Sequence, residues 1–503
     1  MDKYKATIGI EIHVELATQS KMFCECKNGM GMEKKPNKNI CPVCTGQPGS
    51  LPVPNKKAIE YVTRAGLALR CNIARNTKFD RKNYFYPDLP KGYQISQYDK
   101  PLCEKGFLEF DYFNKNEEIK RARVGITRIH LEEDTGKSMH SEGGGETLVD
   151  FNRAGVPLME LVTEPDVKTA EEAKKFCEEL RRIFRYTGIS SADMEKGQMR
   201  CEANVSVYQR GEDPLSGTKV EIKNLNSFKS IEKGIEYEIK RQSELLDKGE
   251  SVKQETRGWD ESKNKSFLQR IKEEADDYRY FPEPDIMPIN FSDKEIDTVL
   301  QALPELPQER IKRFKDQLGL SEQNAEILVD YKEMADYLEQ VCSELYNWVK
   351  IEKFNLTDKE IRKLYKLAAN YLLTETQRHL FDSGKGIENV KITPEDFAEL
   401  IKIIYEGQIN SSSAQIVLKE MFETGADPSH IIKEKDLLQS SDEDELGAIA
   451  EDVIEKNPKS AEDYKKGKEN AIKFLMGQVM KATRGKADPQ AAMKVLKDKL
   501  NKN

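Results

Sequence analysis

The sequence predicts an α+β fold: a strand-rich domain, then an all-helical domain, then a small helical tail domain. Three observations support this. The chain has 503 residues, which at about 150 residues per domain suggests about three domains. Strand-like alternation of apolar and polar residues is confined to the first 290 or so residues, and helical periodicity of 3.6 residues dominates after them. With 38% hydrophobic and 33% charged residues, disorder of the whole chain is excluded.

The expected domains are residues 1–290, with a cysteine-containing loop at 24–44, then 291–408 and 409–503. The first boundary follows a proline-rich stretch at 281–288, and the second lies between Gly407 and Ser413.

Individual elements can be predicted in chain order. Strands are expected at 8–16, 124–133, 202–207 and 219–223, where apolar and polar residues alternate. Helices are expected at 56–69 and at 170–186, the second with Thr169 as N-cap followed by Glu171 and Glu172. Helical periodicity then covers 305–350 and 358–380.

The charge of the chain is unevenly distributed. The net charge is -8, yet residues 464–503 hold eleven Lys or Arg against three Asp or Glu, so this segment carries +8. A basic tail on an acidic body is a candidate contact for the phosphates of a nucleic acid, and the alternative is a lysine-rich helix surface in water. No run of about 18 apolar residues occurs, and the start of the chain lacks the apolar region of a secretory signal. We therefore expect a cytoplasmic protein without a membrane partner.

Two close cysteine pairs indicate a metal site. Cys24 and Cys26 are separated from Cys41 and Cys44 by a 14-residue interval rich in Gly, Lys and Asn. Four thiolates suit tetrahedral Zn²⁺. A loop without apolar periodicity cannot fold by burying apolar residues, so it needs a bound metal ion to fold. A structural zinc is the leading interpretation, with a redox pair or chance clustering as the alternatives. The five isolated cysteines are expected to be small buried residues: Cys71, Cys103, Cys177, Cys201 and Cys342.

The first predicted strand has a face that can bind a cation. Residues 8, 10, 12, 14 and 16 are all aliphatic, so Glu11, His13 and Glu15 share the other face. Same-face residues lie about 6.6–6.8 Å apart along a strand, close enough for Glu11 and His13 to share one ion. Taken alone, this pattern is also that of any half-exposed strand.

The same pattern, a carboxylate on the polar face of a strand, recurs in three later strands, and this favours a cation-binding site. Several carboxylates converging on one cleft would repel one another unless a cation lies among them. Oxygen ligands with a single imidazole suit Mg²⁺ beside phosphates better than they suit zinc. The polar faces concerned are Arg128, His130 and Glu132; Glu202, Asn204 and Ser206; and Lys219, Glu221 and Lys223. The sequence contains neither a P-loop nor a dinucleotide fingerprint, and no nucleophile motif of a hydrolase, so the chain is not expected to release ammonia itself.

Residues 148–162, LVDFNRAGVPLMELV, closely resemble the signature of the GatB family, which provides the B subunit of the aspartyl/glutamyl-tRNA(Asn/Gln) amidotransferases. The similarity spans nearly the whole chain. Its other motifs are GIEIH at 9–13, DRKNYFYPD at 80–88, YQISQ at 93–97, KNLNS at 223–227, DDYRYFPEPD at 276–285 and the tail from 464 to 480.

The resemblance implies a ligase that uses ATP to phosphorylate the side-chain carboxylate of Glu-tRNA(Gln), Asp-tRNA(Asn) or both. Ammonia from an amidase, the A subunit, would then displace the phosphate, and a small C subunit would make the complex a heterotrimer. The catalytic cradle would be the first domain, and the tail would grip the tRNA. The implied Mg²⁺ ligands are Glu11, His13, Glu132, Glu202 and Glu221.

Other residues are expected to contact the phosphates or the nucleotide. Lys223 and Arg128 are expected to contact phosphate, and Lys223, Asn224 and Asn226 to bind the nucleotide; ion pairs with neighbouring carboxylates are the alternative for the two cations. His13 is expected to be a ligand and not a base, because a carboxylate nucleophile has no proton to remove. The competing function is a noncatalytic, zinc-bearing scaffold that binds tRNA.

Overall fold

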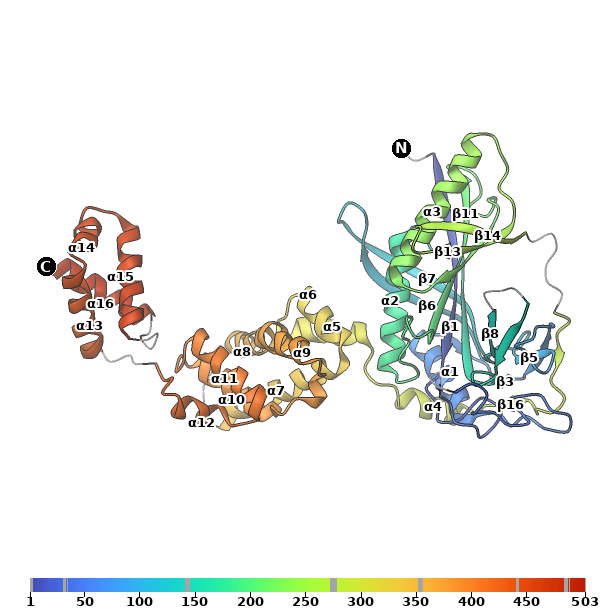
Figure 1. Cartoon of the computed structure of the whole chain (residues 1–503), viewed down its shortest axis with the longest axis horizontal. Helices are drawn as coiled ribbons and strands as arrows, with labels where there is room; N and C mark the ends of the chain where they lie inside the picture. Colours follow the sequence, from blue (N-terminus) through green and yellow to red (C-terminus); the bar gives the residue numbers. More distant parts are fainter. Residues whose placement is uncertain are drawn as a thin grey trace. The chain divides into compact units, whose positions relative to one another are not determined.

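The computed structural model describes residues 3–29, 33, 35–140, 145–271, 278–351, 356–439, 443–483, 487 and 489–502. The chain divides into two compact units, Met1–Pro307 and Gln308–Asn503 (Figure 1). Strands lie in the first unit, and every described element that begins in the second is a helix, which confirms the predicted α+β class. Asp276 and Asp277 of the motif at 276–285, and positions 30–32 and 34 of the cysteine loop, lie outside the described residues.

The described part of the first unit is built on a nine-stranded sheet. Neighbouring strands are antiparallel except for β12 and β13, which are parallel. In spatial order the strands are β14 (Lys265–Ile271), β13 (Glu255–Asp260), β12 (Val220–Leu225), β11 (Met199–Gln209), β1 (Tyr4–Glu15), β10 (Pro157–Thr163), β7 (Ile119–Glu133), β6 (Cys103–Phe113) and β2 (Asn72–Ile73).

Three smaller sheets accompany it. β15 (Phe281–Pro282), β4 (Asp80–Asn83) and β5 (Tyr93–Ser96) form one, β16 (Ile289–Asn290) and β3 (Asn76–Thr77) the second, and β8 (Lys137–His140) and β9 (Thr147–Asp150) the third. Figure 1 shows β5 and β8 on the side of the large sheet away from α2 (Ala170–Tyr186) and α3 (Phe228–Asp247).

The apolar face of the large sheet is covered by helices and forms the core. Ile8, Ile10, Ile12 and Val14 of β1 are buried in one cluster with the apolar residues of α1 (Lys56–Ala68), α2 and α3. Because successive side chains of a strand point to opposite faces, this burial directs the polar residues of β1 to the other face. The helix α4 (Asp293–Gln301) packs against α1 at the end of the unit.

The described part of the second unit consists of helices that pack in two groups. The first group contains α5 (Pro307–Leu318), α6 (Glu322–Asp330), α7 (Lys332–Ile351), α8 (Asp358–Tyr371), the π-turn η1 (Leu372–Thr376), α9 (Gln377–Ser383), the 3₁₀ turn η2 (Ile387–Asn389), α10 (Pro394–Tyr405), α11 (Ser411–Thr424) and α12 (Pro428–Glu434). The second contains α13 (Glu443–Lys456), α14 (Pro458–Lys465), α15 (Glu469–Ala482) and α16 (Pro489–Lys502), which share a separate apolar core. The positions of the domain boundaries stay predictions.

The predicted strands and helices are found where alternation and periodicity placed them. The Thr169 side chain accepts a hydrogen bond from the Glu172 backbone N–H at 3.2 Å, so the expected N-cap of α2 is confirmed. All five isolated cysteines are buried. Among the described residues, none of the helices combines the length and the apolar composition that crossing a membrane requires.

Candidate active site

The polar face of the large sheet lines a cavity of about 920 Å³. Strands β12, β11, β1, β10 and β7 contribute to it, and the far wall comes from β4, β5 and residues 278–280. Adjacent strands are about 4.8 Å apart, so β12 and β7 are separated by about 19 Å. The cavity is therefore wide enough for more than one ligand group.

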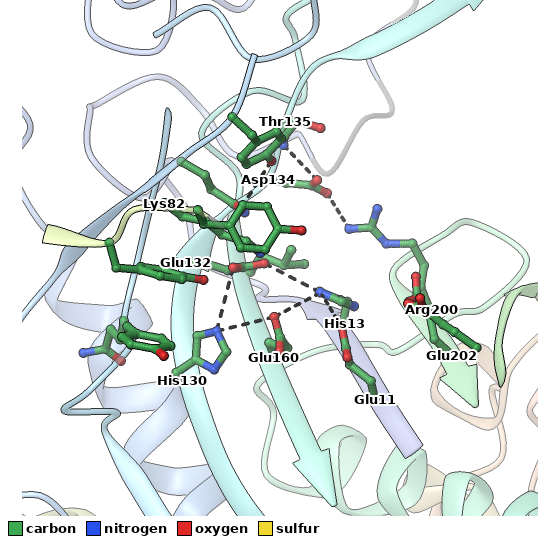
Figure 2. A pocket seen from close by; sticks show the side chains of 18 of the residues that line it. Glu11, His13, Lys82, His130, Glu132, Asp134, Thr135, Glu160, Arg200 and Glu202 are labelled. Carbon is green, nitrogen blue, oxygen red and sulfur yellow. Dashed lines mark hydrogen bonds and ion pairs between the residues drawn. The ribbon is translucent and has the colours of Figure 1, made fainter. Parts of the chain in front are cut away.

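A row of three side chains crosses the middle of this surface. His13 on β1 lies opposite Glu160 on β10, and Glu160 lies opposite His130 on β7. One oxygen of Glu160, Oε2, is 3.4 Å from the Nε2 atoms of both histidines. Figure 2 shows both imidazoles directed at this carboxylate. The strand register thus places a buried carboxylate between two imidazoles.

Two more carboxylates flank the row. Glu11 Oε1 is 3.8 Å from His13 Nε2, and Glu132 Oε1 is 3.7 Å from the same atom. Glu132 also lies 3.8 Å from His130 Nε2 and accepts a hydrogen bond from the Ser96 hydroxyl at 3.2 Å. Figure 2 shows Glu11, Glu132 and Glu160 gathered around His13. These contacts make one compact cluster of three carboxylates and two imidazoles.

A second group of charges lies one strand further along the sheet. Glu202 on β11 is directly opposite Glu11 on β1. Lys223 Nζ is 2.7 Å from Glu202 Oε2 and 3.3 Å from Glu221 Oε1, and Thr256 donates a hydrogen bond to Glu221. Glu202 and Glu221 are thus bridged by a lysine, and neither of these two expected Mg²⁺ ligands belongs to the ligand groups around Glu160 in the described part of the chain.

Burial and the neighbouring charges shift the pKa values of the cluster. Burial alone would lower the pKa of His13, but the hydrogen bond and charge of Glu160, with Glu132 and Glu11, raise it to about 9. The pKa of His130 is raised to about 9 in the same way, against its burial, chiefly by Glu160. Burial and the charge of Glu160 raise the pKa of Glu11 to about 7. The two imidazolium charges, with Lys82 and Arg128, offset the negative charge of the three carboxylates.

The cluster contains two overlapping sets of metal ligands that share Glu160. One set is Glu11, His13 and Glu160, and the other is His130, Glu132 and Glu160; within each set the ligand atoms lie within 4.8 Å of one another. Octahedral Mg²⁺ holds its ligands at about 2.0–2.1 Å, so opposite ligands are about 4.2 Å apart. Small side-chain movements would bring either set to that geometry. The donor types, mostly carboxylate oxygens, also fit Mg²⁺.

The structure brings most of the expected site residues to this cavity. Its lining includes Glu11, His13, Arg128, Glu132, Glu202, Glu221 and Lys223. Arg128 Nη2 lies 4.0 Å from Glu160. Asn224 and Asn226 are exposed at the end of β12 and are not part of the lining, so the geometry gives no support to their expected contact with the nucleotide.

Sequence reasoning missed Glu160 and did not select His130. The strand β10 is buried along nearly its whole length and shows no alternation, so its one carboxylate is not marked by a polar face. The available signal was a lone glutamate inside the otherwise apolar run Leu158 to Val162. Lys82 and four cavity-lining tyrosines were missed as well, because they come from segments distant in sequence.

The four cysteines of the loop at 24–44 are also brought together. Their Sγ atoms all lie within 4.8 Å of one another, and those of Cys41 and Cys44 are 3.8 Å apart. A tetrahedron with Zn–S bonds of about 2.3 Å has edges of about 3.8 Å. The hydrogen bond from Cys24, together with the nearby Lys21 ammonium, lowers the pKa of Cys44 to about 5, which favours a thiolate at this position; the hydrogen bond to Cys44 raises the pKa of Cys24, and burial raises that of Cys26. The donor set therefore fits Zn²⁺.

This loop is tied to the segment that leads into β10. Asn152 accepts hydrogen bonds from the backbone N–H groups of Lys38 and Asn39, both at 2.9 Å, and donates to the Lys35 carbonyl. Asp150 accepts from the Asn37 backbone. These hydrogen bonds thus attach the cysteine loop to residues 150–152, which lead into the strand β10 that carries Glu160.

Comparisons with known proteins agree over the full length of the chain. A family model described as the GatB/GatE catalytic domain matches residues 6–297, and a second, described as the GatB domain, matches residues 352–500. Similar curated proteins are named as the B subunit of aspartyl/glutamyl-tRNA(Asn/Gln) amidotransferase. Those of Caldanaerobacter subterraneus subsp. tengcongensis, Carboxydothermus hydrogenoformans and Brevibacillus brevis are 49%, 48% and 46% identical, covering 99%, 100% and 100% of this chain and 100% of each relative.

Proposed function

The chain belongs to the GatB family of tRNA-dependent amidotransferase subunits, and on this premise we propose that it uses ATP to phosphorylate the side-chain carboxylate of a mischarged tRNA. The substrates would be Glu-tRNA(Gln), Asp-tRNA(Asn) or both. Ammonia would then displace the phosphate to give the amide. The chain would be the kinase and transamidase subunit of a carbon–nitrogen ligase.

The observation that carries this proposal is the convergence of carboxylates in one cavity beside cationic side chains. Glu11, Glu132 and Glu160 lie around His13, while Lys82 and Arg128 line the same cavity. Burying three carboxylates together is unfavourable without compensating charge. A surface that only held tRNA would gain nothing from acids facing a phosphate polymer. A site for phosphoryl transfer needs them, as cation ligands.

The chemistry requires the chain to bring two anions together. The substrate carboxylate forms a bond to the γ-phosphorus of ATP, and the bond from that phosphorus to the bridging oxygen breaks, which releases ADP. Mg²⁺ held by either of the two ligand sets that share Glu160, Glu11 with His13 or His130 with Glu132, would shield these charges and stabilise the transferring group. Because the nucleophile has no proton, the imidazoles serve as ligands.

The cationic side chains orient the phosphates. Lys82 and Arg128 are near the cluster, and the pKa of Lys82 is raised, against its burial, by Glu132 and Glu160. Lys223 is held by Glu202 and Glu221 on the opposite side of the cavity.

In the second step, the ammonia nitrogen bonds to the acyl carbon, and phosphate leaves with the electron pair of the broken C–O bond. The nitrogen then loses a proton.

Other parts of the proposal concern partners. An amidase, the A subunit of the complex, would supply ammonia, and a small C subunit would make the complex a heterotrimer. The +8 charge of residues 464–503 supports tRNA binding by the tail. A structural Zn²⁺ on Cys24, Cys26, Cys41 and Cys44 would hold the loop that braces the entry to β10.

The test is transfer of the labelled γ-phosphate of ATP to mischarged tRNA by the assembled complex. His13→Ala and Glu132→Ala variants should reduce transfer by about 10³-fold, as expected when a charge-neutralising group is lost from phosphoryl transfer. A Lys240→Gln variant, which changes an exposed residue of α3, should leave it unchanged. Near-normal transfer by both site variants would favour the noncatalytic scaffold instead.

A further inference from the structure

Five tyrosines form a continuous row along the wall of the cavity made by β4, β5 and residues 278–280. The rings of Tyr98 and Tyr280 are stacked, with centroids 4.2 Å apart and planes 9° apart. Tyr280 contacts Tyr278 edge to face at 6.1 Å, Tyr278 contacts Tyr84 at 5.9 Å, and Tyr84 contacts Tyr86 at 6.1 Å. Four of the five line the cavity, and Tyr86 extends the row beyond it.

The row is not explained by packing of the hydrophobic core. Among the described residues, Tyr93 and Tyr237 pack against the main core of the first unit, but none of the five does. Tyr98 is 54% exposed and Tyr86 is 64% exposed. Tyr84, Tyr278 and Tyr280 are half-buried. Aromatic rings contribute stability mainly when their faces are buried, so the exposed rings of Tyr98 and Tyr86 gain little unless a ligand covers them.

The row reaches the carboxylate cluster. Tyr84, Tyr278 and Tyr280 line the same cavity as Glu132 and Glu160. Lys82 Nζ is 5.1 Å from the centre of the Tyr278 ring. A ligand stacked on this row would therefore have its next atoms within reach of Glu132 and Glu160.

The opposite side of the cavity has a different character. Lys219 and Lys223 at β12, about 19 Å from β7 in the sheet order, and Arg270 on β14, two strands beyond β12, line that side. Clustered ammonium and guanidinium groups bind a polyphosphate. The cavity thus has an aromatic side suited to bases and, across the carboxylate cluster, a side with Lys219, Arg270 and the Lys223 that pairs with Glu202 and Glu221.

We propose that the tyrosine row is a stacking platform for the unpaired 3′ end of the tRNA, with the terminal adenine on the exposed face of Tyr98. This inference rests on the proposed function, because the reacting carboxylate belongs to an amino acid esterified to the ribose of that terminal nucleotide. A base on Tyr98 leaves the amino acid to extend toward Glu132 and Glu160. Tyr280, stacked behind Tyr98, holds its ring in place, and Tyr278, Tyr84 and Tyr86 lead the preceding bases toward solvent.

The experiment compares two tRNAs, one intact and one without the terminal adenosine, for binding to the full-length chain in the absence of ATP. Stacking on an aromatic side chain strengthens binding by roughly 5- to 150-fold per base, so removing the adenosine should weaken binding to the wild type by such a factor. In Tyr98→Ala and Tyr280→Ala the two tRNAs should bind alike. Tyr98→Phe, which keeps the ring, should behave as wild type. Phe113→Ala, which removes an exposed ring at the end of β6, is the matched control.

Three results would overturn the inference. The first is an unchanged preference for intact tRNA in both alanine variants. The second is loss of that preference in Tyr98→Phe, which would make the hydroxyl and not the ring the recognised group. The third is a rise in the KM for ATP with no effect on tRNA, which would show that the row holds the adenine of the nucleotide. The binding assay needs no ATP. A wild-type chain that failed to transfer phosphate would therefore refute the proposed function, and the tRNA-binding result would still test the stacking platform.

Discussion

Glu160→Gln is the substitution that tests the site most directly. It keeps the shape of the side chain and removes one negative charge that lies 3.4 Å from both His13 and His130. At this distance two unit charges interact by about 5 kcal/mol when the effective dielectric constant is about 20. A doubly charged cation bound to the same oxygen would interact at least as strongly. If most of this energy, about 4 kcal/mol, is lost in the transition state, the rate falls by about 10³-fold.

The assay is transfer of the labelled γ-phosphate to mischarged tRNA by the assembled complex, followed at several Mg²⁺ concentrations. Glu179→Gln is the matched control, because Glu179 on α2 is also a buried carboxylate with cationic partners, Lys175 and Arg182, but lies outside the cavity. The backbone pairing of β10 with β1 and β7 does not involve the side chain, so the fold should persist in Glu160→Gln. Transfer within threefold of wild type at every Mg²⁺ concentration would refute the assignment of Glu160 as the shared ligand.

Three further results are expected. Metal analysis should find one zinc per chain, and changing Cys41 and Cys44 to Ser should abolish zinc binding and make the loop at 24–44 sensitive to protease. Changing the exposed Lys473 and Lys497 of the tail to Gln should weaken tRNA binding and lower the slope of log affinity against log salt by about one for each phosphate that is no longer bound. Thr169→Ala should lower the free energy of unfolding by about 1 kcal/mol, measured by urea titration, because α2 loses its cap.

Each of these three predictions has a control variant. Cys342→Ser, at an isolated buried cysteine, should keep the zinc; retention of zinc by the double variant would exclude the four-thiolate site. Lys240→Gln lies outside the tail and should keep the salt slope, and an unchanged slope in the tail variant would make its lysines a solvated surface only. Thr169→Ser retains a capping hydroxyl and should restore the stability, whereas equal losses in both variants would argue against the cap.

Local sequence patterns were sufficient for several elements and for three of the five residues of the cluster, Glu11, His13 and Glu132. Period-two alternation in residues 8–16 places Glu11 and His13 on one face because strand side chains must alternate, and the structure has β1 there. The limits of α2 follow from its cap and its apolar stripe, both properties of neighbouring residues. The spacing of the four cysteines likewise predicted the pairs that the structure brings together.

Only the tertiary structure decided which of these residues meet. Glu160 becomes the centre of the site because the register pairs β10 with β1 and β7, whose residues lie far from it in the chain; a strand buried on both sides carries no alternation that could mark it. The tyrosine row joins residues 84–98 to 278–280 through the pairing of β4 with β15. Contacts of this kind depend on how the core of the whole unit packs, and no local pattern of the sequence encodes them.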